Sequence, residues 1–169
     1  ANSGAIEQFE GLEETHIRPG LMLYGGTSLM PKVRSESQWS GKLISSLKTV
    51  ILNSFKVTKG TPIGYGASPC HDSGVIAVIA LGYGDGFLTR YQGVSILRNG
   101  IEARVVGRIN MDMAQVLFKQ ESILNLNVGE EFVVWDHSGE NFMRICDQSK
   151  TSAYEVFVHL TSRVPKVYK

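Results

Sequence analysis

Short runs of β-branched and apolar residues, separated by glycines, dominate the pattern of hydrophobic and polar positions along the chain. Most of the 18 glycines stand between such runs, where a positive φ angle turns one strand into the next. The pattern is typical of a mainly β fold, either a small barrel or a sandwich. It predicts strands over residues 42–57, 75–81, 94–98, 101–106, 113–118 and 131–135.

Three segments carry more specific strand signals. Asn99-Gly100 separates two β-branched runs, and this pair tolerates the positive φ angles of a type I′ turn, so a two-residue hairpin is predicted there. Residues 75–81 are almost continuously apolar, which indicates a strand covered on both faces. A further strand is expected over residues 16–24, with an interruption at Pro19-Gly20.

Helical segments are predicted only near the two ends of the chain. Residues 4–11 are expected to form one or two turns, and residues 141–148 a short helix. Ser152 and Glu155 fit a capping box, in which the serine accepts a backbone N–H and the glutamate reaches back to the cap. Residues 25–41 show no periodicity and are interpreted as a linker or a long ordered loop.

The charges nearly cancel, with 17 Lys+Arg against 16 Asp+Glu and a formal net charge of +1. Because binding to a phosphate backbone needs a basic excess, nucleic acid is not expected as a partner. No apolar run approaches the roughly 18 residues of a membrane helix, so no membrane partner is expected either. Two cysteines without CxxC spacing and four scattered histidines argue against a metal site. The chain shows no signal segment and does not begin with Met, so it is interpreted as processed or partial.

Several residues could carry chemistry, and each also has a structural interpretation. Tyr65 and Tyr83 are flanked by glycines, so each phenol either stands clear to meet a ligand or covers a hairpin turn. Arg18 precedes Pro19-Gly20 and is either part of an anion site or a solvated cation. Asp112 stands between two methionines, which either line a site or pack in the core while the aspartate caps a turn.

The residues around these positions, and their order along the chain, resemble the C-terminal part of one family, the pyridoxal-phosphate (PLP) dependent alanine racemases. Each motif alone is weak, but the ordered set spans nearly the whole chain and is specific. The matching segments are Asn2-Ser3-Gly4, Ile17-Arg18-Pro19-Gly20, Leu23-Tyr24-Gly25, Ile63-Gly64-Tyr65-Gly66-Ala67, Leu81-Gly82-Tyr83-Gly84-Asp85-Gly86, Val106-Gly107-Arg108-Ile109-Asn110-Met111-Asp112, Val128-Gly129, Thr151-Ser152-Ala153-Tyr154-Glu155 and Arg163-Val164-Pro165-Lys166-Val167-Tyr168.

The resemblance implies a domain organisation and a set of partners. Residues 1–25 would be the end of a PLP-binding (β/α)8 barrel, an α/β stub, and residues 26–41 a linker. Residues 42–169 would be a closed, Greek-key-like β-barrel domain with a C-terminal helical segment. The family also implies a head-to-tail homodimer in which the partner's C-terminal domain completes each active site. Its members interconvert L- and D-alanine in the cytoplasm, which supplies D-alanine for peptidoglycan of the cell wall.

The resemblance also assigns roles at the cofactor, pyridoxal 5′-phosphate. Ser3, Gly20, Leu21 and Tyr154 match the ligands of its phosphate, and hydroxyls and amides suit a dianion of this kind. Arg18 matches the arginine that donates to the pyridine nitrogen. Because an arginine stays charged, it would keep that nitrogen unprotonated.

Four further residues match the family's catalytic and substrate-binding positions. Tyr65 matches the catalytic tyrosine, which is one of the two bases that racemisation needs on opposite faces of the substrate. The backbone of Met111 matches a contact to the substrate carboxylate from across the dimer interface. Tyr83 and Arg108 match positions at the substrate entrance, where a narrow corridor selects a small side chain.

The chain departs from the family pattern in three places. Asn110 stands where a cysteine is usual, and Ser68-Pro69 stands where a threonine and an aromatic residue are common. The lysine that carries PLP in the family has no counterpart in this sequence, so the chain alone is expected to be inactive. Two alternatives stay open, namely a racemase for serine, lysine or a broad range of amino acids, and a non-catalytic β-barrel dimerisation module. The dimerisation module does not explain the presence of Ser3 and Arg18.

Overall fold

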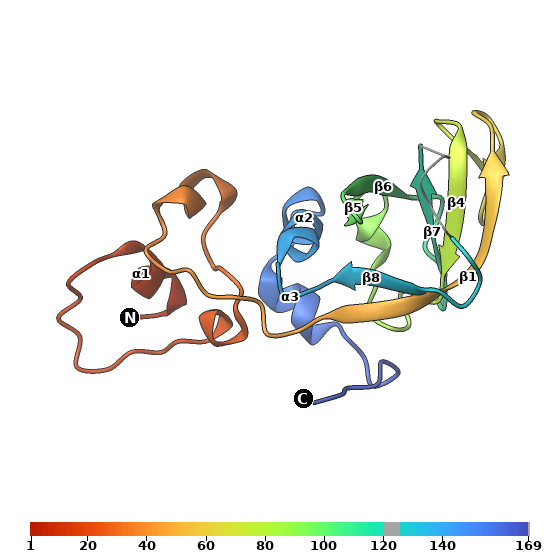
Figure 1. The fold of residues 1–169 in the computed structure, drawn as a ribbon. Helices are drawn as coiled ribbons and strands as arrows, with labels where there is room; N and C mark the ends of the chain where they lie inside the picture. The colour runs from red at the N-terminus through yellow and green to blue at the C-terminus, as the bar shows by residue number, and fades with distance from the viewer. Residues whose placement is uncertain (120–125, 169) are drawn as a thin grey trace.

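The computed structural model describes residues 1–119 and 126–168. An N-terminal part with helix α1 stands beside a β-barrel, and two further helices, α2 and α3, lie between them (Figure 1). The N-terminal part holds α1 (Ser3–Gln8) and two 3-10 helices, η1 (Leu21–Tyr24) and η2 (Pro31–Glu36). The remaining elements are β1 (Leu47–Val57), β2 (Pro62–Ile63), β3 (Ser68–Pro69), β4 (Gly74–Ile79), η3 (Thr89–Tyr91), β5 (Ser95–Arg98), β6 (Ile101–Val106), β7 (Ala114–Phe118), β8 (Glu131–Trp135), α2 (Glu140–Gln148) and α3 (Ala153–Val158).

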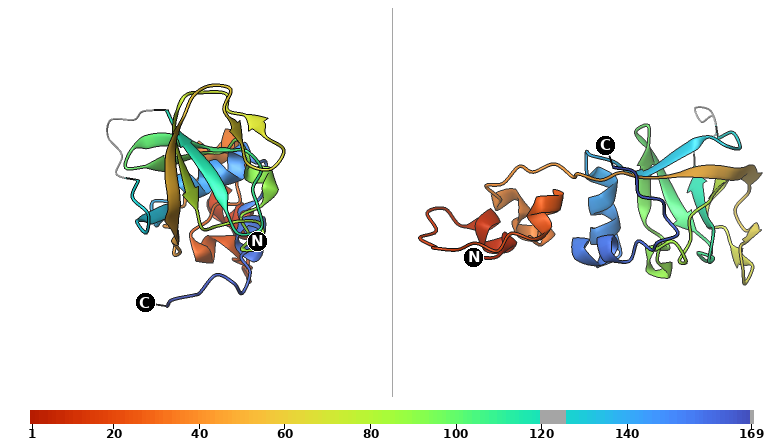
Figure 2. Two further views of the ribbon diagram at one scale, coloured as in Figure 1. Left: turned by 90° about the vertical axis from the view of Figure 1, so that its right-hand side faces the viewer. Right: turned by 90° about the horizontal axis from the view of Figure 1, so that it is seen from below.

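Six strands form one antiparallel sheet in the order β5-β6-β7-β4-β1-β8. The sheet curls until its two edges, β5 and β8, approach each other (Figure 2, left). The Arg98 side chain of β5 spans this seam, because it donates to the Glu131 carbonyl of β8 at 2.7 Å and lies over the Phe132 ring. The prediction of a mainly β barrel domain is therefore confirmed, and the barrel is nearly closed.

The free edge of β5 is covered by helix α2. The Asn141 side chain accepts from the Leu97 N–H at 2.7 Å and donates to its carbonyl at 2.8 Å. Two turns later, the Gln148 side chain accepts from the Ser95 N–H at 2.8 Å. An unpaired strand edge is a template for aggregation, and these side chains satisfy the backbone groups that no neighbouring strand reaches.

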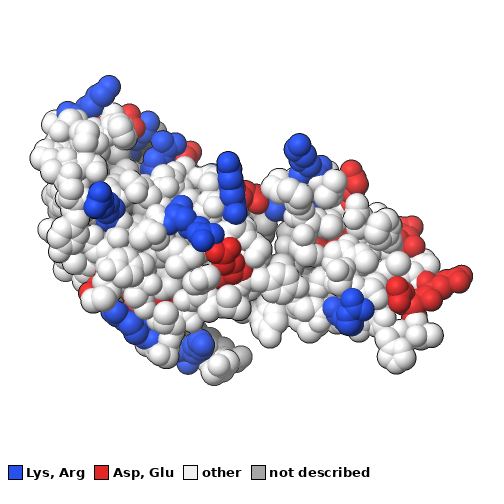
Figure 3. Space-filling model, turned by 180° about the vertical axis from the view of Figure 1, so that it is seen from behind, with Lys and Arg blue, Asp and Glu red and all other residues white. Residues whose placement is uncertain are grey.

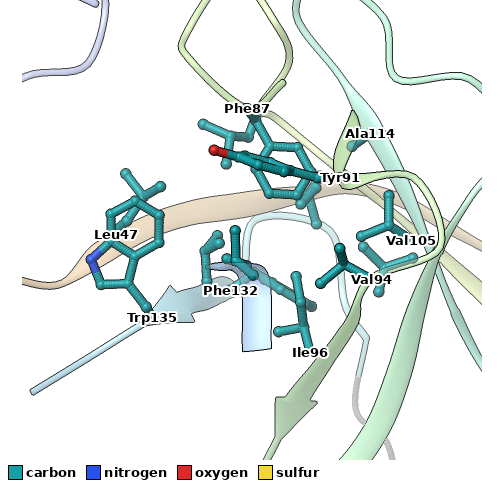
Figure 4. Packing of buried hydrophobic residues seen from close by; sticks show 14 of the residues in the cluster. Leu47, Phe87, Tyr91, Val94, Ile96, Val105, Ala114, Phe132 and Trp135 are labelled. Atoms are coloured by element: carbon teal, nitrogen blue, oxygen red, sulfur yellow. The ribbon is translucent and has the colours of Figure 1, made fainter. Parts of the chain in front are cut away.

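Aromatic side chains fill the barrel and join it to the helices. The rings of Phe87 and Tyr91 meet edge to face with centroids 5.2 Å apart, and Phe132 and Trp135 of β8 lie in the same cluster (Figure 4). Trp135 also meets Phe142 of α2 edge to face at 5.4 Å. Edge-to-face pairs suit the ring quadrupole, so α2 is fixed against the end of the barrel that faces the N-terminal part.

The predicted strands of the barrel are confirmed with shifts of at most two residues at their ends, except that the strand expected from residue 42 begins at Leu47. Asn99 and Gly100 have φ angles of 52° and 77°, as a type I′ turn requires, and they join β5 to β6. Strand β4 lies inside the sheet between β1 and β7. Its side chains are buried or half-buried throughout, as the continuous apolar run predicts.

The expected strand over residues 16–24 is wrong. Arg18 forms only an isolated parallel bridge with Asn2, and the chain then enters the 3-10 helix η1. Pro19 has no N–H to donate to a ladder, and Gly20 adopts φ −128° and ψ −88°, outside the strand region. The segment expected to be a linker or loop contains the 3-10 helix η2, with Pro31 at its start.

Charged side chains are dispersed over the visible surface. On the face in Figure 3, Lys and Arg lie mainly over the barrel, and acidic side chains gather at the end of the N-terminal part. In the described ranges, no helix is long and apolar enough to cross a membrane.

Candidate functional site

The structure divides the predicted site residues into two groups. Ser3, Gly20, Leu21 and Tyr154 come together where the N-terminal part meets α3. Arg18 lies beside this first group, bridged to Asn2. Tyr65, Tyr83, Arg108 and Met111 gather near the β2–β3 hairpin, which is drawn in yellow at the end of the barrel farthest from the N-terminal part (Figure 2, right). The two groups therefore occupy separate places in one copy of the chain.

The first group is a set of two hydroxyls and two backbone amides, here called the amide–hydroxyl cluster. The Gly20 N–H donates to Ser3 Oγ at 2.9 Å, and the Leu21 N–H donates to the Tyr154 hydroxyl at 3.1 Å. Both hydroxyls accept these bonds, so each keeps its own proton to donate to a further group. A Cβ at residue 20 would stand 3.0 Å from the Tyr154 oxygen, so a larger residue there would require the tyrosine hydroxyl to shift by a few tenths of an ångström.

Short local contacts hold Ser3 and Gly20 in register. Asn2 caps α1, because its side chain accepts from the Ala5 N–H at 3.0 Å, and Ser3 is the first residue of that helix. The Arg18 N–H donates to the carbonyl of Ala1 at 2.7 Å. These contacts bring residues 18–20 alongside the start of α1.

Tyr154 is positioned by the start of α3. Ser152 caps this helix by accepting from the Glu155 N–H at 3.2 Å, which confirms half of the predicted capping box. The other half is wrong, because the Glu155 carboxylate pairs with Arg90 at 2.7 Å and accepts from the Thr151 hydroxyl. An ion pair competes well with a backbone amide for one carboxylate, so Glu155 ties α3 to the barrel.

The second group lines a cavity of about 600 Å³. Tyr65 stands in the turn between β2 and β3, between two glycines with φ angles of 61° and 85°, and 71% of its surface is exposed. Tyr65 therefore lies in a hairpin turn, as one interpretation expected, and its phenol is also exposed, as the other expected. Tyr83, Arg108 and Met111 line the same cavity, with the stretch from Ile109 to Met113.

Two loops are bonded together beside this cavity. The Tyr83 N–H donates to the Asn110 carbonyl, and the Gly84 N–H donates to the Met111 carbonyl, both at 2.9 Å. A Cβ on Gly82 would stand 2.3 Å from the Asn110 oxygen, so this approach requires glycine. The Met111 N–H has no acceptor among the described residues, and it remains available to a ligand.

Arg163 ties both loops to the C-terminal tail. Its Nε lies 3.1 Å from Asp85, and its Nη2 pairs with Asp112. The hydrogen bond that Arg163 donates to the Asp112 carboxylate raises the pKa of the Arg163 guanidinium. Asp112 therefore serves an ion pair, and Met111 and Met113 on either side of it are 49% and 37% exposed instead of packing in the core. The sequence alone did not predict this role for Arg163, although the residue begins the C-terminal family motif of residues 163–168.

Two observations bear on other ligands. In residues 1–119 and 126–168, no group of three or more His, Cys, Asp or Glu side chains could hold a metal ion. The Asn110 side-chain oxygen is buried and has no hydrogen-bond partner within the described residues. Its position in the cavity lining makes it a polar feature of the site.

Several solved structures with this fold are alanine racemases. The biosynthetic alanine racemase from Pseudomonas aeruginosa superposes with a TM-score of 0.82 at 30% identity, over 100% of this chain and 46% of that one. An alanine racemase from Clostridium difficile 630 in complex with cycloserine gives a TM-score of 0.77 at 30% identity, over 97% of this chain and 43% of that one. The fold thus defines the class, which is a domain of PLP-type amino-acid racemases.

Comparison of sequences leads to the same family. Residues 44–168 match the family described as "Alanine racemase, C-terminal domain". A catabolic alanine racemase from Schizosaccharomyces pombe is 35% identical over 90% of this chain and 42% of its own length. The biosynthetic enzyme of Escherichia coli K12 is 31% identical over 99% of this chain and 46% of its own length. The chain belongs to the alanine racemase family, and it spans less than half the length of these curated relatives.

Proposed function

We propose that this chain is part of a PLP-dependent racemase that interconverts L- and D-alanine. The observation that carries the proposal is the amide–hydroxyl cluster, in which four residues from three separate segments of the sequence come together. Two O–H and two N–H donors without a carboxylate suit a phosphate dianion. The names of the relatives from Schizosaccharomyces pombe and Escherichia coli support alanine as the substrate.

In this proposal the cluster holds the phosphate of PLP. Ser3 and Tyr154 donate their hydroxyl protons, and Gly20 and Leu21 turn their N–H groups from the hydroxyls to the phosphate. Arg18 lies two residues before Gly20 and donates to the pyridine nitrogen of PLP. The permanent charge of the arginine keeps that nitrogen unprotonated. When bound, PLP withdraws electrons from the α-carbon of an attached amino acid.

Tyr65 moves the proton on one face of the substrate α-carbon. Its exposed phenol on a glycine-flanked turn can reach into another subunit. Arg108 lines the same cavity. Racemisation needs a base on the other face, and we assign this role to the lysine that carries the cofactor, outside these 169 residues. The chain alone is then inactive.

The remaining residues of the cavity bind the substrate. The free N–H of Met111 donates to the carboxylate, and Tyr83 with Arg108 narrows the entrance so that a small side chain is preferred. The bonds between the two loops keep Tyr83 and Met111 at a constant separation. We include in this proposal the domain limits 1–25, 26–41 and 42–169, a cytoplasmic location and the supply of D-alanine to peptidoglycan.

The separation of the two groups supports a head-to-tail homodimer. The amide–hydroxyl cluster lies where the N-terminal part meets α3, whereas Tyr65 stands in the turn between β2 and β3 at the far end of the barrel (Figure 2, right). A symmetric pair arranged head to tail brings the cluster of one protomer to the cavity of its partner, twice. Each active site then combines a cofactor half and a substrate half.

One experiment tests the role of Tyr65 directly. In the enzyme that contains this chain, Tyr65→Phe should abolish racemisation, while exchange of the α-hydrogen with deuterated solvent persists for one enantiomer only, because one base remains. Tyr168→Phe, at a tyrosine 89% exposed, is the matched control and should behave as wild type. Racemisation by Tyr65→Phe at the wild-type rate, or by the isolated chain, would refute the proposal.

A second candidate is a racemase for a polar amino acid such as serine. The unpartnered Asn110 oxygen in the cavity lining favours it, since a buried acceptor gains most from a substrate that carries a donor. Comparing the D/L exchange of alanine, serine and lysine by the same enzyme separates the two candidates.

A further inference from the structure

Glu7 is a buried carboxylate that the proposed chemistry does not use. It lies on α1 with 0% of its surface exposed. Its two oxygens accept from the Thr27 hydroxyl at 2.5 Å, the Ser28 N–H at 3.0 Å and the Ser28 hydroxyl at 2.8 Å. Burying a carboxylate is costly unless hydrogen bonds compensate for the lost water, so these three donors determine where Glu7 can lie.

The buried face of α1 consists of Ser3 and Glu7, one helical turn apart. Ser3 contacts Gly20, and Glu7 contacts residues 27–28. The segment between these contacts contains η1, whose first residue supplies the second amide of the amide–hydroxyl cluster. One face of one helix therefore holds both ends of the segment that carries the two amides.

Helix α1 depends on these contacts for its position. It has six residues, and isolated helices shorter than about 12 residues are marginal in water. A Cβ on Gly4 would stand 3.3 Å from Ser28 Oγ, so α1 and the loop at Ser28 are closely packed. If the carboxylate of Glu7 is lost, the loop at 27–28 and the helix lose their common anchor.

We propose that Glu7 is a positioning residue for the phosphate-binding cluster. Through Thr27 and Ser28 it fixes the end of the segment 20–28, and so it sets the spacing between the hydroxyl of Ser3 and the N–H of Leu21. It does not touch the cofactor. The inference rests on the proposed function, because it takes the cluster to be the phosphate site.

The test uses Glu7→Gln in the enzyme that contains this chain, with Glu10→Gln as the matched control. Glu10 is an exposed glutamate just beyond α1. The probes are pyridoxine 5′-phosphate and pyridoxine, which differ only in the phosphate. Glu7→Gln should weaken the binding of pyridoxine 5′-phosphate by about tenfold, because the charge-assisted hydrogen bonds of Glu7 to Thr27 and Ser28 are lost. Binding of pyridoxine should not change, and the amides of Gly20 and Leu21 should exchange hydrogen faster.

The outcomes separate the inference from the proposed function. If wild type does not prefer the phosphate-bearing probe, the cluster is not a phosphate site and the proposed function itself fails. If wild type shows the preference and Glu7→Gln retains it in full, Glu7 is merely structural and the inference is overturned. If Glu7→Gln does not fold, the double variant Thr27→Val with Ser28→Ala removes the donors instead, and it should lose the same preference. A double variant that keeps the preference overturns the inference equally.

Discussion

Replacing Gly82 by alanine should separate the two loops beside the cavity. Gly82 has no positive φ angle, so alanine causes no backbone strain there. Its Cβ would stand 2.3 Å from the Asn110 oxygen, whereas ordinary contact begins at 3.4 Å. Relief of this clash requires a movement of about 1 Å, since the repulsion is steep at this range.

That movement has a calculable cost. The two bonds between the loops, from the Tyr83 and Gly84 N–H groups, are 2.9 Å long and would not survive a displacement of this size. At about 1 kcal/mol for each backbone hydrogen bond, the free energy of unfolding should fall by about 2 kcal/mol. The same displacement moves Tyr83 and Met111 apart, so KM for the substrate should rise in Gly82→Ala as well.

Urea unfolding and steady-state kinetics measure the two effects, with Gly60→Ala as the control. Gly60 has a φ angle of 92° and nothing within 4 Å of its hypothetical Cβ. Alanine there costs about 1–2 kcal/mol from backbone conformation alone, and it should leave KM unchanged. The reasoning is refuted if Gly82→Ala unfolds at the wild-type urea concentration, or if both variants raise KM alike.

Two further predictions concern single hydrogen bonds. Tyr154→Phe removes the hydroxyl proposed to donate to the phosphate, so pyridoxine 5′-phosphate should bind at least about tenfold more weakly in a titration where pyridoxine is unaffected; equal losses for both probes would contradict this. Hydrogen bonds from the Ser138 hydroxyl and N–H lower the pKa of Asp136. Its stabilising contribution is therefore present above the ordinary pKa of about 3.9 and lost as pH falls through the lowered value. Urea unfolding between pH 2 and pH 6 should show a smaller acid-side loss in Asp136→Asn than in wild type, and identical profiles would contradict the assignment.

Local sequence determined the elements whose geometry depends on neighbouring residues. Asn99-Gly100 specifies its turn because few residues tolerate two successive positive φ angles. The glycines around Tyr65 specify a turn that exposes the phenol. The β-branched and apolar runs specify strands, since these side chains fit a pleated, half-buried surface. These features were predictable because dihedral preference and periodicity act over a few residues.

The tertiary structure decided which distant groups meet. The hydroxyl of Tyr154 reaches the Leu21 amide across 133 positions of the chain, and no periodicity encodes such a pairing. Arg98 crosses the seam of the barrel only because the sheet has curled. Residues 16–24 have strand-like composition, but without a ladder partner a proline-interrupted segment cannot remain a strand. A glutamate is usually found at the surface. Glu7 is buried because three donors of Thr27 and Ser28 bind its carboxylate. Local propensity determines the elements, whereas hydrogen-bond satisfaction and packing between elements determine the site.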